Sequence, residues 1–196
     1  MNAQIKTLTP GALYEGDDVF VGIINVNGVQ KGILLPPKPV RQYPELVIYN
    51  DGPVKGTTSW NDGQANTRDM ADAGSKLAQW ALDNGMHIPS MDELDIIYRT
   101  CKPTTEQNWL GNRSGINVSA IPPTYPYTSD FPAQTTLEQF KAGGPEAFDT
   151  NDWYWSSTRS PDSEASAYAQ YFYYGFQNSW AVYHAFLGVA VRWIDL

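Results

Sequence analysis

The hydrophobic residues of this chain change their spacing twice along its length, and this limits the folds that it can adopt. Residues 17–36 place β-branched residues around Asn27-Gly28, a dipeptide typical of two-residue hairpin turns, so they predict a β-hairpin. From Asn66 apolar residues recur every three or four positions, which predicts one helix of about 18 residues, capped by Asn66 and followed by Gly85. After residue 152 strand-forming residues return. This order predicts an α+β fold with a mixed or antiparallel sheet.

A second helix is predicted directly after the first. Ser90 and Glu93 have the spacing of a capping box, Cys101 lies on the apolar stripe that follows, and Pro103 stops the helix. Residues 103–135 contain three turn clusters and no sustained period, which predicts a long loop. Its own aromatic side chains are expected to pack it down: Trp109, Tyr125, Tyr127 and Phe131.

The remaining segments predict short elements and connectors. Prolines make residues 36–44 a stiff connector before a short apolar run at 46–49, and residues 135–141 predict a single helical stretch. Residues 1–56 form an N-terminal β segment that either docks the domain to a larger assembly or completes its sheet, and residues 57–196 form the main domain. Late strands are predicted where aromatic and β-branched residues are dense, at 153–158, 168–175, 179–184 and 189–194.

Charge and cysteine content exclude several classes of protein. Asp and Glu number 21 against 13 Lys and Arg, and a net charge of -8 argues against a surface that follows nucleic-acid phosphates. A single cysteine, Cys101, can form neither an internal disulfide nor a four-thiolate zinc site. No apolar run has the length of a signal-peptide core or a membrane span, so we expect neither a signal peptide nor membrane insertion.

Eight short motifs, each weak alone, follow one another from about residue 15 to the end of the chain. They are Ser59-Trp-Asn-Asp-Gly63 with Ala65-Asn-Thr67, Ile88-Pro-Ser90 before Asp92-Glu-Leu94, Tyr98-Arg99 with Lys102-Pro-Thr-Thr105, Pro132-Ala-Gln-Thr135, Phe140 with Gly143-Gly144 and Ala147-Phe148, Tyr154-Trp-Ser-Ser-Thr158, Gln170 with Phe172 and Gly175, and Val191-Arg192. Together they resemble the phage and prophage domain family with a C-type-lectin-like fold. That family is related to the variable proteins of diversity-generating retroelements and, more remotely, to the phage major tropism determinant.

The resemblance implies a specific architecture and a mode of action. Two helices would flank a small, twisted, mostly antiparallel sheet, preceded by the β-hairpin, and the C-terminal strands and their loops would form a displayed face. The relatives that are understood bind a partner through that face and are located on virions. The family implies no reaction.

The C-terminal aromatic residues are the main candidate site. Side chains alternate along a strand, so one face would hold Tyr168, Gln170, Phe172 and Tyr174, and the other Tyr171, Tyr173 and Phe176. Either all these rings are core, or one face is displayed as rigid contact area. Display is favoured because 26 aromatic residues are difficult to bury in one domain of this size. The predicted binding residues, which match the stretch that varies in the retroelement relatives, are Tyr173, Tyr174, Phe176, Asn178, Trp180, Tyr183, His184 and Phe186.

Two functional hypotheses follow. The first is a non-enzymatic virion protein at a tail tip, tail fibre or capsid surface, which binds a host receptor, protein or glycan, or a neighbouring virion protein, with no cofactor or metal. The second is a structural decoration or assembly protein that uses the same face as a homo-oligomer interface around a two-fold or three-fold axis. The enzyme branch of this fold, of the formylglycine-generating type, requires a reactive cysteine pair, whereas this chain has one cysteine.

Other motifs favour structural roles. Trp60-Asn61-Asp62 is similar to a triplet of calcium-dependent lectins, but it precedes a helix and has no partner triplet, so we expect a turn with Trp60 buried. The acidic pairs Asp17-Asp18 and Asp149 with Asp152 are expected to be solvated or capping groups. Nothing in the sequence brings Cys101 to His87 or His184, so a core position is expected for the thiol. We expect Arg192 to be a buried guanidinium that closes the last strand onto a carboxylate or carbonyl.

Overall fold

The predicted β-hairpin is present. The computed structural model of this chain describes residues 8–111, 113 and 115–196, and within them β1 (Val19–Val26) pairs antiparallel with β2 (Val29–Leu35). Val26 pairs with Val29, so Asn27 and Gly28 form the two-residue turn that their sequence favours.

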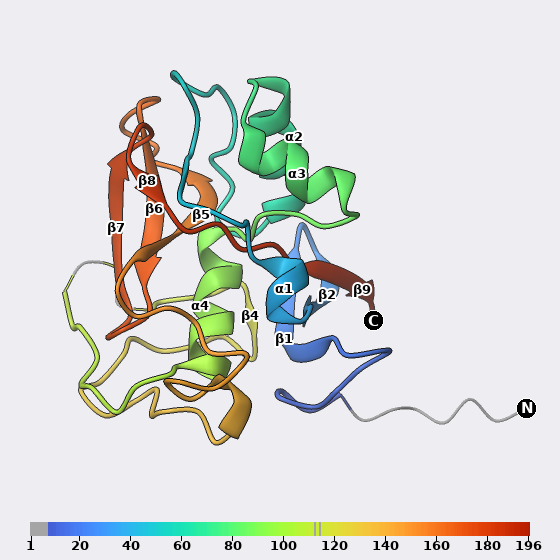
Figure 1. Cartoon of the computed structure of the whole chain (residues 1–196), viewed down its shortest axis with the longest axis vertical. Helices are drawn as coiled ribbons and strands as arrows, with labels where there is room; N and C mark the ends of the chain where they lie inside the picture. Colours follow the sequence, from blue (N-terminus) through green and yellow to red (C-terminus); the bar gives the residue numbers. More distant parts are fainter. Residues whose placement is uncertain (1–7, 112, 114) are drawn as a thin grey trace, which may run out of the picture.

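The hairpin is the centre of a four-stranded sheet that joins the early and late parts of the chain. The strand order is β4-β1-β2-β9, where β4 is Ala120–Ile121 and β9 is Arg192–Asp195. A smaller sheet pairs β3 (Val47–Ile48) with β8 (Ala185–Phe186). Residues before position 56 therefore share both of these sheets with C-terminal strands, as Figure 1 shows for β2 and β9.

The third sheet is antiparallel and has the order β5-β6-β7. Its strands are β5 (Trp153–Arg159), β6 (Ser166–Tyr171) and β7 (Phe176–Ala181). The predicted strand at 168–175 is wrong in its second half, because the chain reverses there: Gly175 has a φ of 78° and its N–H donates to the Tyr171 carbonyl at 2.8 Å. The predicted strand at 179–184 likewise begins earlier and ends at Ala181.

Helix α4 (Met91–Cys101) lies between the third sheet and the hairpin sheet (Figure 1). Its predicted capping box is confirmed: the Ser90 hydroxyl accepts from the Glu93 N–H, and the Glu93 carboxylate accepts from the Ser90 N–H at 2.7 Å. Nearly the whole helix is buried, and Cys101 lies in the core of the protein, as predicted.

The single long helix predicted after Asn66 is wrong, because the chain forms two helices there. They are α2 (Gly63–Asp72) and α3 (Lys76–Asp83), and Asp62, not Asn66, caps the first one. Gly74 between them has a φ of 94°, and the Ser75 side chain accepts from the Ala78 N–H as a new N-cap. The expected apolar stripe is retained across the break, since α3 continues to bury Leu77, Ala78 and Ala81.

The proline connector contains a short helix that the sequence did not predict. Helix α1 (Lys38–Arg41) places the Arg41 side chain in the interior, where it is 2 % exposed. Its guanidinium donates to the Pro36 carbonyl at 2.9 Å, to the Glu146 carbonyl at 2.7 Å and to the Glu146 carboxylate. Arg41 therefore fixes the connector to the segment that leads into β5.

The region between α4 and β5 is mainly loop, as predicted. Besides β4, its regular structure in the described chain is the 3₁₀ helix η1 (Glu138–Phe140), which lies in the predicted 135–141 stretch. The expected aromatic packing is confirmed for Tyr127, which is 5 % exposed. It is wrong for three other rings, which are 46–85 % exposed: Trp109, Phe131 and Tyr125.

Two hydrophobic clusters fill the interior. The first joins the hairpin, α4 and the inner face of the third sheet, including Ile33, Leu94, Tyr154 and Phe172. The second lies on the other face of that sheet, under β3, β8 and α3, and is organised around Trp155. Each face of the third sheet therefore packs against one of the two clusters. This packing makes the sheet a rigid support for those of its side chains that reach solvent.

A buried carboxylate connects α4 to the last strand. Glu93 is fully buried, and its Oε1 lies 2.8 Å from His87 Nε2 and 2.5 Å from the Trp193 indole nitrogen. The Trp193 N–H donates to it, and the His87 backbone pairs with Val191. Arg192 has the expected carboxylate partner, Asp18 at 2.8 Å, although its side chain is 37 % exposed rather than buried.

The α+β class is confirmed, with antiparallel strand pairing in all three sheets. Four α-helices, rather than two, accompany these sheets in the described residues. Within that same part of the chain, no helix combines the length and apolar character that crossing a bilayer requires.

Replacement of Ser75 by Ala should destabilise the junction between α2 and α3. The Ser75 hydroxyl donates to the Tyr49 carbonyl at 2.7 Å, so the change removes a cap and a buried hydrogen bond together. We expect a loss of about 1–2 kcal/mol in the free energy of unfolding, measured by urea denaturation. Ser129→Ala is the control, since that hydroxyl makes no hydrogen bond within the described residues; equal losses in both variants would contradict this role.

Alkaline pH should destabilise the fold through its buried tyrosines. Burial raises the pKa of Tyr49, Tyr98, Tyr127 and Tyr154 above the ordinary value of 10.0. Above pH 10 the folded state therefore binds more protons than the unfolded state, and stability falls as pH rises. Ultraviolet titration should show these phenols ionising only on unfolding, and their free titration in the folded protein would contradict the assignment.

Candidate functional site

A row of aromatic rings crosses the third sheet from strand to strand. Trp153 on β5 pairs with Tyr171 on β6, and Tyr171 pairs with Phe176 on β7. The Trp153 ring lies 5.5 Å from Tyr171 and 5.3 Å from Phe176, measured between centroids. Paired positions in neighbouring strands point to the same face, so the three rings form one contiguous surface.

Further rings extend the row at both ends. At one end Trp109, from the loop after α4, lies 4.9 Å from the Phe176 ring, and Tyr174 lies 5.2 Å from Tyr171. At the other end Trp180 lies 5.2 Å from Trp153 and is followed by the residues after β7. We call this surface the aromatic face and define it as Trp109, Trp153, Tyr171, Tyr173, Tyr174, Phe176, Asn178, Trp180, Tyr183 and His184.

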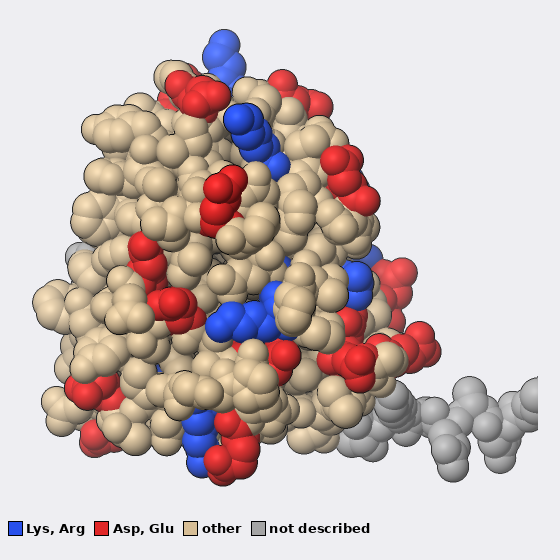
Figure 2. Space-filling view, in the orientation of Figure 1, with Lys and Arg blue, Asp and Glu red and all other residues tan. Residues whose placement is uncertain are grey.

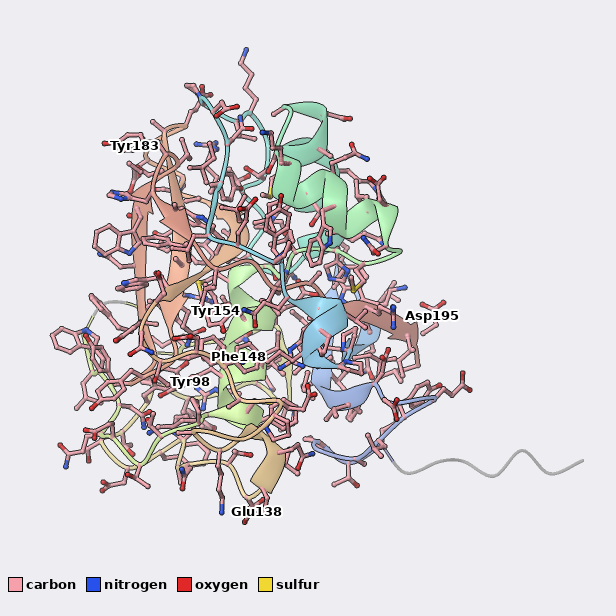
Figure 3. All side chains as sticks on the ribbon, viewed as in Figure 1. Tyr98, Glu138, Phe148, Tyr154, Tyr183 and Asp195 are labelled. Atoms are coloured by element: carbon pink, nitrogen blue, oxygen red, sulfur yellow. The ribbon has the colours of Figure 1, made fainter. Side chains whose placement is uncertain are left out.

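Exposure differs among the eight predicted binding residues. Tyr183 is the most exposed at 71 %, and Figure 3 shows it at the outer end of the sheet, away from α4. Phe186 is buried, so the expectation that its ring is displayed is wrong for this residue. Its ring lies 4.7 Å from Trp155 and 5.7 Å from His184, which places it beneath the aromatic face. The other six are half-buried: Tyr173, Tyr174, Phe176, Asn178, Trp180 and His184.

The alternation predicted for residues 168–176 holds only within the strand. Gln170 and Phe172 are buried toward α4, and Tyr171 is on the opposite face, as alternation requires. Tyr174 was expected beside Phe172, but it contacts Tyr171 instead, because the chain has already turned after β6. Three rings of the aromatic face were not among the predicted binding residues: Trp109, Trp153 and Tyr171.

Hydrogen bonds from the loop after α4 hold the turn between β6 and β7 in place. The Thr104 hydroxyl donates to the Tyr173 carbonyl at 2.5 Å, and the Trp109 N–H donates to the Tyr174 carbonyl at 2.9 Å. A side chain at Gly175 would have no room, since a Cβ there would lie 2.5 Å from the Tyr98 ring. The loop after α4 therefore determines where Tyr173 and Tyr174 lie.

Lys102 anchors that loop from the interior. Its side chain is almost fully buried, and Nζ donates to the Glu106 carbonyl at 2.6 Å, to Asn108 Oδ1 at 2.9 Å and to the Pro132 carbonyl at 3.1 Å. Burial lowers the pKa of this ammonium group. The Tyr98 hydroxyl donates to the same Asn108 oxygen at 2.8 Å, so the loop is tied directly to α4.

The aromatic face carries little charge. In Figure 2 the side of the molecule where β7 and β8 lie is covered mainly by uncharged side chains. Glu106 is one of its acidic neighbours, and its hydrogen bond raises the pKa of the Tyr173 phenol. Rings with hydroxyl, indole and imidazole groups can supply apolar contact together with hydrogen bonds.

The other candidate residues occupy structural positions. Asp149 Oδ1 accepts from the Asn151 N–H and Asp152 Oδ1 from the Trp153 N–H, each at 2.7 Å, so both cap turns as expected. Burial raises the pKa of the Cys101 thiol to about 12, which disfavours the thiolate. Trp60 is half-buried rather than buried. Among the described residues, no three His, Cys, Asp or Glu side chains are grouped to hold a metal ion.

Replacement of Lys102 by Met should loosen the loop that carries Trp109. The change removes the three hydrogen bonds that the buried Nζ makes, so we expect a loss of about 2–4 kcal/mol in stability and faster hydrogen exchange at 104–110. Lys141→Met is the control, because Lys141 makes a surface pair with Glu138 and its loss should cost under about 1 kcal/mol. Unchanged exchange in the loop of Lys102→Met would contradict the anchoring role.

Comparison of the chain with protein-family models, with curated proteins and with solved structures finds no match.

Proposed function

We propose that this chain is a non-enzymatic binding protein of a phage or prophage virion, located at a tail tip, tail fibre or capsid surface. Its aromatic face would recognise a receptor on the host cell surface or a neighbouring virion protein. The observation that carries the proposal is the continuous row of partly exposed rings from Trp109 to Tyr183, mounted on a sheet that is packed on both faces.

Such a surface suits recognition for a physical reason. Tyr and Trp have few rotatable bonds, so binding through them costs little conformational entropy while it removes large apolar areas from water. The rings already contact one another at 4.9–6.3 Å, and their positions are therefore set before a partner arrives. Preorganisation of this kind raises affinity because less order has to be imposed on binding.

The C-type-lectin-like fold remains part of the proposal. It is supported by the α+β class, by the antiparallel third sheet, and by the position of the Tyr154-Trp-Ser-Ser-Thr158 motif within β5. The resemblance of the motifs supplies the placement on a virion, since the relatives that are understood act there. In those relatives the displayed face is formed by C-terminal strands and their loops, and the aromatic face is built from β5, β6 and β7, the segments that follow β6 and β7, and Trp109.

The second candidate function is assembly of the chain with copies of itself. One observation favours it: β7 is an edge strand that pairs with β6 alone in the described chain. An open edge offers unpaired N–H and C=O groups, and a second copy could pair with them around a two-fold axis. The aromatic face would then be an oligomer interface.

Replacement of exposed rings should separate the two functions. We expect Tyr183→Ala and Tyr173→Ala each to weaken binding of the labelled protein to host cells by about tenfold or more, because a few aromatic anchors dominate the binding energy of such interfaces. The fold, measured by circular dichroism, and the oligomeric state, measured by sedimentation, should not change.

Tyr125→Ala is the matched control for these two variants. Tyr125 is 85 % exposed but lies in the loop before β5, outside the aromatic face. Equal losses of cell binding in the control and in the two variants would contradict recognition through the aromatic face. Dissociation of an oligomer by Tyr183→Ala or Tyr173→Ala would favour the assembly function instead.

A further inference from the structure

A pocket opens beside β7, at the sheet edge that no other strand covers in the described chain. Its volume is about 470 Å³, within the usual range for small-molecule sites. Two elements far apart in sequence from β7 contribute to it, the segment before α2 and the loop after α4. The lining residues are Trp60, Arg113, Tyr168, Gln177, Asn178 and Ser179.

Two inclined rings form the apolar part of this pocket. The Trp60 and Tyr168 centroids are 4.8 Å apart, with 52° between the ring planes. The Arg113 guanidinium lies 4.4 Å from the Trp60 ring and forms an ion pair with the Asp92 carboxylate. Trp60 is also held through its backbone, because its carbonyl accepts from the Asp92 N–H at 3.0 Å. The rings are thus fixed in position without filling the pocket.

Four of the lining residues carry polar groups that are not used within the described part of the chain. Within the described residues, no hydrogen bond is made by the Trp60 indole N–H, the Tyr168 hydroxyl, the Ser179 hydroxyl or the Asn178 amide. The buried Asn117 side chain nearby, by contrast, donates to the Asp92 carbonyl at 2.7 Å. The pocket therefore offers donors and acceptors that a ligand could use.

The charge of the pocket restricts the ligand. Arg113 is the charged residue in the lining, and its ion pair with Asp92 already neutralises it. An anion would have to compete with the Asp92 carboxylate, and a cation would meet the guanidinium. An uncharged ligand is therefore favoured over either ion.

A second depression continues from the first. It has a volume of about 580 Å³, shares Trp60 and Arg113, and is lined by neutral hydroxyl and amide side chains as well as exposed apolar ones. Trp60 and Arg113 form the wall between the two hollows. The residues that belong to this second hollow alone are Thr58, Ser59, Asn61, Asp92, Ile116, Val118 and Ser119.

We propose that the pocket beside β7 binds one pyranose unit of an uncharged glycan, and that the second depression accommodates the next unit. A pyranose has an apolar C–H face that can stack on Trp60 or Tyr168, and equatorial hydroxyls that both donate and accept hydrogen bonds. The inference deepens the proposed function, on which it rests, by naming a ligand class and a subsite at the edge of the aromatic face. No calcium ion takes part, because the recognition uses rings, hydroxyls and amides.

The test is a printed array of bacterial surface polysaccharides and their monosaccharides, followed by calorimetric titration of the glycans retained. We expect retention by the unmodified protein in the presence of a chelator. Trp60→Ala should weaken binding about thirtyfold or more, since it removes the stacking surface. Tyr168→Phe, which keeps the ring and the fold, should weaken it about three- to tenfold by removing one hydrogen bond.

Tyr183→Ala is the control that separates this inference from the proposed function, because Tyr183 does not line the pocket. It should lower cell binding while it leaves the affinity for a retained glycan unchanged. Retention of no glycan, or equal affinity of Tyr168→Phe, Trp60→Ala and the unmodified protein, would overturn the pocket assignment, and recognition through the aromatic face would still stand. Loss of glycan binding in Tyr183→Ala alone would place the sugar on the aromatic face and would likewise overturn it.

Discussion

The fold depends on a carboxylate that has no contact with water. Glu93 is fully buried, and it accepts hydrogen bonds from the Ser90 N–H, the His87 ring and the Trp193 indole. These three donors belong to the start of α4, the segment before it and the last strand. A buried carboxylate is stable only when its lone pairs accept hydrogen bonds. Loss of any one of these three donors would therefore make the burial of Glu93 unfavourable. Glu93 thereby fixes α4 against β9, and the hairpin sheet against the rest of the molecule.

Buried hydrogen bonds also connect α4 to the aromatic face. Tyr98 on α4 binds Asn108, Lys102 at its C-terminal end binds three loop oxygens, and Thr104 binds the turn after β6. On the same side of the third sheet as Trp153, the buried Trp155 supports the strands, and its indole N–H donates to the Val47 carbonyl at 2.9 Å. Rings that would be mobile on a free loop are therefore held at defined positions, which is what the proposed selective binding requires of a surface.

Local chemistry made several elements predictable. Asn27-Gly28 favours one kind of turn, and Ser90 with Glu93 can satisfy two backbone groups within four residues, so neither depends on distant contacts. The division of the first long helix was also encoded, in Gly74 followed by Ser75, but an apolar stripe that continues across the break concealed it. The reversal at Gly175 was missed for a similar reason, since dense aromatic residues on both sides suggested one continuous strand.

The sequence by itself determined the α+β class, the hairpin, the capped α4 and the core position of Cys101. These follow from spacing and from interactions between neighbouring residues. Only the tertiary structure decided which aromatic residues reach solvent: Phe186 is covered whereas Tyr183 is exposed, and Trp109 joins the aromatic face from a loop about 45 residues before β5. The burial of a residue depends on the segments that pack over it, and those segments are brought together only when the chain folds.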